Sequence, residues 1–357
     1  FPARDGEREG LVMNSLLKVS HLRVYFPVGK TWTFGRTTGY TKAVDGVSFE
    51  IRRGETFGVV GESGSGKTTL GRAVLRAIEP TGGEIIYHRD GNTIDIMGLK
   101  RNSLREMWRH MQMIFQDPYS SLNPRMTVRD VLSEPLIANK LAKGAELNDC
   151  VVDIAQRCGL DVEHLSRYPH AFSGGQRQRI AIARTLVLRP EFIVCDEPVS
   201  ALDVSIQAQI LNLLKDLQQQ FDLTFLFIAH DLTAVSYICD RVAVMYLGQI
   251  VEVAPTEALY YSPKHPYTEA LMSAIPEADP SQIMKPVLLE GERPSPANPP
   301  VGCRFHTRCQ YVTQICRESP PALKEGEAGH LVACHRAGEL TLKGALEHGA
   351  SISTETR

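Results

Sequence analysis

The hydrophobic positions of the chain follow two different periods. Short apolar runs typical of buried strands occur at residues 17–26, 43–51, 56–60, 192–195, 224–229 and 242–246. Other stretches repeat at helical spacing, and residues 204–221 place one apolar stripe on a predicted helix, formed by Ile206, Ile210, Leu213, Leu214 and Leu217. Strands that alternate with helices predict an α/β fold built on a parallel sheet.

Shifts in composition predict how the chain is divided. Residues 16–260 carry the alternating elements and form the expected main domain, in which residues 117–172 are polar and predict an inserted helical subdomain. A C-terminal extension is expected over residues 261–340, with a stiff proline-rich linker at its centre. Residues 1–15 are expected to be an N-terminal extension or tag, and residues 341–357 a polar tail.

The charge balance excludes one broad class of function. The 357 residues contain 39 Lys and Arg against 41 Asp and Glu, so the formal net charge is −2. A general nucleic-acid binder is normally strongly basic, so no nucleic-acid partner is expected. The apolar runs are far shorter than the ~20 residues that span a bilayer, and no membrane-spanning segment is expected. No signal peptide opens the chain, which predicts a cytosolic compartment.

Residues 61–68 read GESGSGKT and fit the phosphate-loop pattern G-x-x-x-x-G-K-[ST]. A predicted strand precedes them and a helical pattern from Leu70 to Ile78 follows, as this motif requires. Glycines let backbone N–H groups surround phosphates, Lys67 reaches the β- and γ-phosphates, and the Thr68 hydroxyl ligates Mg²⁺. The residues expected to bind ATP here are Gly61, Ser63, Gly64, Ser65, Gly66, Lys67, Thr68 and Thr69.

Two carboxylates follow the apolar run 192–195. Asp196 and Glu197 stand at its C-terminal end, where parallel α/β sheets bind their ligands. Asp196 is expected to hold Mg²⁺, and Glu197 to be the base that polarises the attacking water. An ordinary strand ending in an acidic turn would show the same pattern, but the phosphate loop favours a nucleotide site.

A third motif, FSGGQRQR at residues 172–179, resembles the signature of ABC ATPases. By itself it predicts only a helix capped by Ser173. The other elements of that family stand in order around it: Gln116 in FQDP matches the Q-loop, Asp203 in SALD the D-loop, and His230 in AHDL the switch histidine. The chain therefore resembles ABC ATPases from residue 16 to about residue 254.

This resemblance implies an ABC-type P-loop domain that works as a head-to-tail dimer. Each ATP would lie between the phosphate loop of one subunit and the signature helix of the other. The signature residues implied to contact this ATP are Ser173, Gly174, Gly175, Gln176 and, nearby, Asp203. Phe26 matches the aromatic that stacks on adenine, with Tyr25 and Tyr40 as alternatives.

The same resemblance assigns the chemistry of hydrolysis. Glu197, His230 and Gln116 are the implied catalytic residues, with His230 holding Glu197 and the γ-phosphate in register. The implied Mg²⁺ ligands are Thr68, Gln116 and Asp196, Gln116 also sensing the attacking water. A competent ATPase is expected, because all of these residues are present.

The C-terminal third narrows the resemblance to importers. HPYT at 265–268, LEGE at 289–292, PSPANPP at 294–300 and GCRF at 302–305 resemble the extension of dipeptide, oligopeptide and nickel importer ATPases. RYPH and SSLNPR, at 167–170 and 120–125, resemble the second of the two ATPase subunits in such importers. A DNA-repair or ribosome-bound ABC ATPase is disfavoured, because the chain has one ATPase domain and no long coiled coil.

An importer ATPase implies several partners. These are a second ATPase subunit, two transmembrane permease subunits and an extracytoplasmic substrate-binding protein, with this chain bound peripherally at the cytoplasmic face of the membrane. Di- or oligopeptides are the implied cargo. An importer of nickel, glutathione or opines is the alternative.

Four of the eight cysteines lie within 32 residues near the C-terminus, in the pattern C-x5-C-x6-C-x17-C formed by Cys303, Cys309, Cys316 and Cys334. Disulfides are rare inside cells, so a metal site is expected. Four thiolates suit either Zn²⁺ or a [4Fe–4S] cluster, and four unrelated buried thiols are a third interpretation. The resemblance favours a structural [4Fe–4S] cluster. His306, His330 and His335 are expected at the surface, and the other cysteines in the core.

Overall fold

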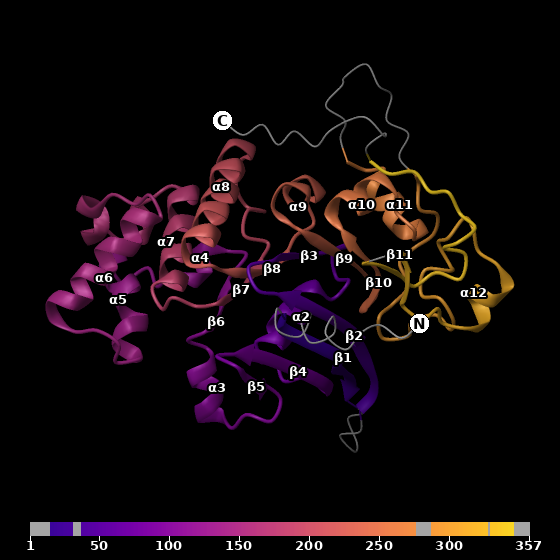
Figure 1. The fold of residues 1–357 in the computed structure, drawn as a ribbon, viewed down its shortest axis with the longest axis horizontal. Helices are drawn as coiled ribbons and strands as arrows, with labels where there is room; N and C mark the ends of the chain where they lie inside the picture. The colour runs from indigo at the N-terminus through magenta and orange to yellow at the C-terminus, as the bar shows by residue number, and fades with distance from the viewer. Residues whose placement is uncertain (1–14, 31–36, 276–286, 328, 346–357) are drawn as a thin grey trace.

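The computed structural model describes residues 15–30, 37–275, 287–327 and 329–345, so most of the expected N-terminal extension and polar tail lies outside the described residues. Two sheets and the helices around them make up the fold (Figure 1). The helices are α2 (Lys67–Val74), α3 (Arg101–Met107), α4 (Pro118–Ser121), α5 (Val128–Ala138), α6 (Gly144–Arg157), α7 (Gly174–Leu186), α8 (Val204–Phe221), α9 (Leu232–Ile238), α10 (Thr256–Tyr261), α11 (Pro266–Met272) and α12 (Gln314–Glu318), with the 3-10 turns η1 (Val162–Ser166) and η2 (Pro169–Ala171).

The larger sheet has the strand order β11-β12-β10-β9-β3-β8-β7-β6. Its strands are β3 (Thr56–Val60), β6 (Met111–Ile114), β7 (Phe192–Asp196), β8 (Thr224–Ile228), β9 (Arg241–Tyr246), β10 (Gln249–Pro255), β11 (Lys324–Glu327) and β12 (His330–Val332). From β9 to β6 the neighbours are parallel, whereas the pairs from β9 to β11 are antiparallel. Strand β7 is buried on both faces: Ile193 and Cys195 face one apolar core, Phe192 and Val194 the other. The expected α/β fold is therefore confirmed.

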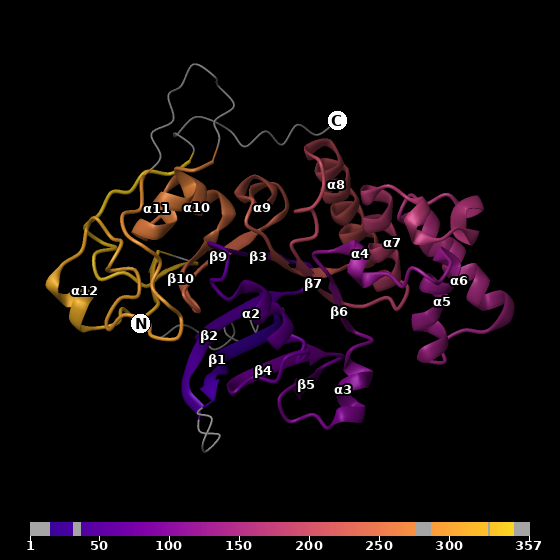
Figure 2. The ribbon, with the colours of Figure 1, turned by 180° about the vertical axis from the view of Figure 1, so that it is seen from behind.

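The second sheet is antiparallel, in the order β2-β1-β4-β5. Its strands are β1 (Ser15–Lys30), β2 (Thr37–Arg52), β4 (Gly82–Arg89) and β5 (Asn92–Asp95). Helix α2 lies beside β1 and β2 (Figure 2). It shares one core with both sheets, since Leu70 and Val74 pack in the same cluster as Leu17 of β1 and Val59 of β3. The start of α2, which carries the phosphate-loop lysine, is thus fixed by packing on two sides.

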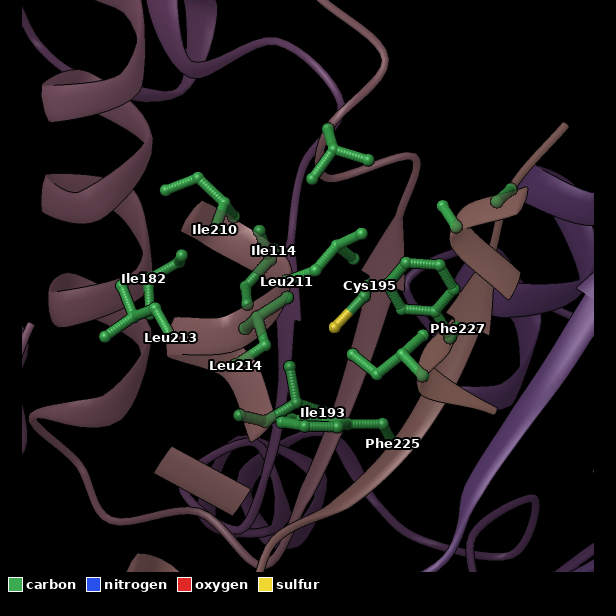
Figure 3. Close-up of a cluster of buried hydrophobic side chains, with 14 of the residues drawn as sticks. Ile114, Ile182, Ile193, Cys195, Ile210, Leu211, Leu213, Leu214, Phe225 and Phe227 are labelled. Atoms are coloured by element: carbon green, nitrogen blue, oxygen red, sulfur yellow. The ribbon is translucent and has the colours of Figure 1, made fainter. Parts of the chain in front are cut away.

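The apolar stripe predicted over 204–221 is found on α8, which has those same bounds. Its residues Ile210, Leu213 and Leu214 pack beside β7 and β8, with Cys195 in the same cluster (Figure 3). The helix after the phosphate loop is shorter than predicted: α2 ends at Val74, and Arg76 takes a φ of 52°. The hydrophobic spacing predicted a longer helix because Leu75 and Ile78, which lie beyond its end, also pack on the core.

Residues 117–172 contain α4, α5, α6, η1 and η2 and, among the described residues, no strand. Helices α5 and α6 lie at the opposite end of the molecule from α12 (Figure 1). The C-terminal extension joins the main sheet, because β12 pairs with β10, Glu252 opposite Val332 and Val253 opposite Leu331.

Candidate active site

Three glycines shape the loop between β3 and α2. Gly61, Gly64 and Gly66 have φ angles of 149°, 71° and 107°, in the region that other residues rarely adopt. A Cβ on Gly66 would lie 2.0 Å from the carbonyl oxygen of Ala43, and one on Gly61 would lie 2.1 Å from that of Met245. Gly61 and Gly66 must therefore be glycines, because the loop passes too close to the backbones of β2 and β9 to leave room for a side chain.

Lys67 begins α2 and turns its side chain back along the loop. Its Nζ donates to the carbonyl oxygens of Gly61 and Glu62 at 2.6 and 3.0 Å. Burial lowers the pKa of Lys67, and the carboxylates of Glu197 and Asp196 partly offset this effect. The ammonium group is thus held over the concave side of the loop, where a phosphate would bind.

Thr68 and Asp196 bring the loop and strand β7 together. The Thr68 hydroxyl donates to Oδ1 of Asp196 at 2.9 Å, and Asp196 is almost completely buried. Burial raises the pKa of Asp196, which the Thr68 hydrogen bond and the Arg72 guanidinium oppose. A hydroxyl and a carboxylate at this separation form a set of oxygen donors that suits Mg²⁺.

Glu197 is held from two sides. Gln116 donates from Nε2 to Oε2 of Glu197 at 2.8 Å, and Nδ1 of His230 lies 3.2 Å from the same oxygen. Glu197 has a φ of 49°, an uncommon conformation for a residue with a side chain. The three predicted catalytic side chains therefore meet at one carboxylate oxygen.

These groups line a single cavity of about 400 Å³. Its walls are formed by Ser63, Gly64, Gly66, Lys67, Thr68, Thr69, Gln116, Glu197 and His230. The other residues predicted to bind nucleotide or Mg²⁺ do not line it: Phe26, Gly61, Ser65, Asp196, the signature residues 173–176 and Asp203. Gly61 and Asp196 are bonded to residues that do line it, since Gly61 accepts from Lys67 and Asp196 accepts from Thr68. The signature residues belong to α7 and its cap.

The signature motif forms the N-terminus of α7. Ser173 and Gln176 make a reciprocal capping box: the Ser173 hydroxyl accepts from the Gln176 N–H at 3.3 Å, and Gln176 Oε1 accepts from the Ser173 N–H at 3.0 Å. Both residues are exposed. A Cβ on Gly175 would lie 2.5 Å from Ile206 of α8, so close helix packing requires this glycine. Asp203, before α8, is also exposed.

The aromatic candidates for adenine stand at the end of the β1–β2 hairpin. Phe26 and Tyr40 are 40% and 52% exposed, and Phe26 pairs with Thr41 across the hairpin. The hydroxyl of Tyr25 donates to Asp45, and burial raises the pKa of Tyr25 to about 12. Phe26 and Tyr40 thus offer open ring faces, whereas the hydroxyl of Tyr25 is engaged.

The four C-terminal cysteines converge on one small cavity of about 20 Å³, roughly the space of one water. Burial raises the pKa of Cys303 to about 12 and that of Cys309 to about 11. Within the described residues, however, no group of three or more His, Cys, Asp or Glu side chains is arranged to hold a metal ion. The arrangement therefore gives no support to the expected [4Fe–4S] cluster.

One expectation about the histidines was wrong. His330 is buried, with Nε2 2.7 Å from Oε1 of Glu252, a carboxylate that also accepts the N–H groups of Lys264 and His265. A buried carboxylate is costly unless hydrogen-bonding groups surround it. The pairing of β12 with β10 places the imidazole ring of His330 beside Glu252. His306 and His335 are half-buried beside the cysteines, not fully exposed as expected.

The signature helix, the Q-loop and the phosphate loop on this sheet together define an ATP-binding cassette, an ATPase of the ABC class. The ABC transporter family matches residues 44–200, and the C-terminal region of oligopeptide/dipeptide transporters matches residues 251–316. The oligopeptide transport ATP-binding protein AppF of Bacillus subtilis is 49% identical over 324 residues, which cover 90% of this chain and 97% of AppF. The chain therefore belongs to the family of oligopeptide transport ATP-binding proteins.

Solved structures agree with this assignment. The protein cbiO1 of Clostridium perfringens, part of an ABC transporter complex, superposes with a TM-score of 0.59 at 27% identity, covering 69% of this chain and 91% of cbiO1. The dimeric ATP-binding cassette MJ0796, bound to ADP and phosphate, gives a TM-score of 0.58 at 26% identity, covering 68% and 99%. No helix in the described part of the chain is long and apolar enough to cross a membrane.

Sequence reasoning missed several residues that touch the phosphate loop. Tyr267, Arg293 and Arg308, all from the C-terminal extension, bond to Glu62 or Ser63. No local signal marks them, because they lie more than 200 positions from the loop.

Proposed function

We propose that this chain is one of two ATPase subunits that power the uptake of di- or oligopeptides through separate membrane subunits. One observation supports ATP hydrolysis: the side chains of Gln116 and His230 both contact Oε2 of Glu197. These residues line the same cavity as Lys67 and Thr68. Peptide as the cargo rests on family membership and on the match of residues 251–316 to the oligopeptide/dipeptide transporter C-terminal region.

In this mechanism the phosphate loop binds the β- and γ-phosphates through its N–H groups and the Lys67 ammonium. Glu197, held by Gln116 and His230, accepts a proton from the water that attacks the γ-phosphate. The same two contacts orient the carboxylate before ATP arrives, so little reorganisation is needed during the reaction. His230, which lines the same cavity, would also contact the γ-phosphate and so respond to its presence.

The oxygen donors at Thr68 and Asp196 fit Mg²⁺, which would neutralise charge on the phosphates during transfer. The Thr68 hydroxyl binds through its lone pairs, and the buried Asp196 provides the negative charge. Gln116, whose side chain lines the same cavity, would complete the oxygen set.

The exposed signature helix would serve the second ATPase subunit. The N-terminus of α7, capped by Ser173 and Gln176, is exposed and carries the positive end of the helix dipole. A head-to-tail dimer would place the other subunit's ATP there. The remaining partners are two permease subunits and a substrate-binding protein, with this chain at the cytoplasmic face of the membrane.

The cysteine site is a separate proposal. We propose that Cys303, Cys309, Cys316 and Cys334 bind a structural metal centre, which is [4Fe–4S] or Zn²⁺. Support comes from the four thiols, spread over 32 residues of the extension, that line one cavity. A metal would displace the thiol protons, and a four-iron cluster would require the thiols to move further apart than a single ion would.

Transport in reconstituted vesicles tests the cargo. The full complex should accumulate labelled di- or oligopeptide with ATP on the side of this chain, and Glu197→Gln should abolish uptake. Uptake of nickel, glutathione or opines without peptide would contradict the assignment.

A further inference from the structure

The C-terminal extension reaches back to the phosphate loop at Glu62. The N–H of Glu62 donates to the hydroxyl oxygen of Tyr267 at 2.8 Å. Tyr267 is fully buried in α11, and its ring packs against Tyr246 and Phe305 with centroids 4.6 and 5.4 Å away. The backbone of Glu62 is therefore fixed to a rigid aromatic cluster, outside the ATPase motifs.

The side chain of Glu62 is bound by a second residue of the extension. Arg308 Nη1 lies 3.1 Å from both carboxylate oxygens of Glu62. The side chains of Arg308 and Glu62 are 10% and 27% exposed, so water screens this pair less than a surface pair. Arg308 follows Phe305 of the aromatic cluster and donates its N–H to the Phe305 carbonyl oxygen at 3.0 Å.

The next loop residue is bound as well. Arg293 donates from Nη1 to the carbonyl oxygen of Ser63, and a Cβ on Gly64 would lie 3.1 Å from its guanidinium. Three residues further on, the carbonyl oxygen of Pro296 accepts the N–H of Lys42 at 3.1 Å. Residues 293–296 thus connect Lys42 of strand β2 to Ser63 of the phosphate loop.

We propose that Tyr267, Arg293 and Arg308 are positioning residues of the ATP site, which hold the phosphate loop at Glu62 and Ser63. Their contacts engage the Glu62 N–H, the Glu62 carboxylate and the Ser63 carbonyl oxygen, and none of them uses an N–H group of residues 63–68. The physical reason is conformational entropy. Fixing the backbone of a flexible residue costs free energy, and a loop that is ordered before ATP arrives does not spend ATP binding energy on this ordering. ATP affinity of this chain would then depend on its own extension. This inference rests on the proposed ATPase function.

The test compares Arg308→Gln, Glu62→Gln and the double variant with wild type, in the full chain assembled with its partner ATPase. We expect each single variant to weaken MgATP binding about tenfold, the scale of a charge-assisted hydrogen bond. The turnover number at saturating MgATP should stay within about twofold, because no reacting group is removed. The double variant should bind MgATP no more weakly than either single variant.

Two further variants separate positioning from general destabilisation. Tyr267→Phe keeps the buried ring but removes the oxygen that accepts the Glu62 N–H, and should also weaken MgATP binding. Arg317→Gln, an exposed residue of α12, is the matched control and should bind like wild type. Arg308→Lys should restore part of the affinity lost in Arg308→Gln.

Unchanged MgATP binding in Arg308→Gln, Glu62→Gln and Tyr267→Phe would overturn the inference, as would strictly additive losses in the double variant. If Arg308→Gln does not fold, Glu62→Gln and Tyr267→Phe decide the question alone. A wild-type complex that neither binds nor hydrolyses MgATP would instead overturn the proposed function.

Discussion

Gln116 donates a hydrogen bond of 2.8 Å to Oε2 of Glu197, although the two residues are 81 positions apart in the chain. Gln116 follows β6 and Glu197 follows β7, and these neighbouring parallel strands end at the same edge of the sheet. The contact therefore links the start of the helical region to the carboxylate expected to act as base.

Replacing Glu197 by Gln should lower ATP hydrolysis by at least about 100-fold, because an amide does not accept the water's proton. MgATP binding should persist, since Lys67 and the loop are untouched. Steady-state phosphate release and nucleotide binding measure the two effects. Glu257→Gln, an exposed residue of α10, is the control. Near-normal hydrolysis in Glu197→Gln would show that another group acts as the base.

Gly66→Ala should damage both stability and nucleotide binding. The new Cβ would lie 2.0 Å from the Ala43 carbonyl oxygen, in a residue whose φ is 107°. We expect a loss of about 3 kcal/mol or more in the free energy of unfolding, measured in urea. Gly82→Ala is the control, because a Cβ there would meet nothing within 4 Å. Equal stability of the two variants would contradict the steric argument.

Acid should destabilise the protein through His265. Burial lowers the pKa of His265 from 6.5 to about 4, and the carboxylate of Glu252, which also accepts the His265 N–H and faces His330, opposes this shift only in part. Between pH 6.5 and 4 the unfolded chain binds a proton that the native state does not, so stability falls as the pH falls. From pH 7 to 5 this residue should account for about 2 kcal/mol.

His265→Asn tests this contribution. An Asn side chain can still accept the Tyr267 N–H that His265 Nδ1 accepts at 3.0 Å, so the start of α11 is retained. The loss of unfolding free energy between pH 7 and 5 should be smaller than in wild type. His21→Asn, at an exposed position, should leave the acid loss unchanged. If the free energy of unfolding of His265→Asn falls between pH 7 and 5 as much as that of wild type, other groups cause the acid destabilisation.

Cys316→Ser should remove the metal proposed for the cysteine site. Iron, acid-labile sulfide and zinc analyses, with the visible spectrum, identify the centre in the wild-type chain purified without oxygen. Iron with sulfide and a broad brown absorbance indicates [4Fe–4S]; zinc without colour indicates a single ion. Cys150→Ser, outside the extension, should keep the wild-type metal content. A wild-type chain that binds neither metal would leave four buried thiols.

Much of this protein was predictable from sequence. Residues 204–221 and 56–60 form α8 and β3 with those bounds, because a full apolar stripe or a fully buried run is a strong local signal. Strands β4, β5, β6, β10, β11 and β12 escaped prediction. Strands β5, β6, β11 and β12 have four residues or fewer, β4 is buried on one face at most, and Glu252 interrupts the apolar run of β10. The resemblance to ABC ATPases predicted the roles of Glu197, Gln116 and His230, which stay predictions, and the structure brings the three side chains together.

Tertiary structure alone decided how the extension relates to the ATP site. The sequence by itself determined the class of fold and the phosphate loop, because strand burial, glycine φ angles and helix capping are local properties. The bonds from Tyr267 and Arg308 to Glu62, and the burial of His330 against Glu252, join segments that no periodicity connects. Such contacts depend on where β12 pairs and where Phe305 packs, and packing between distant segments leaves no spacing rule in the chain.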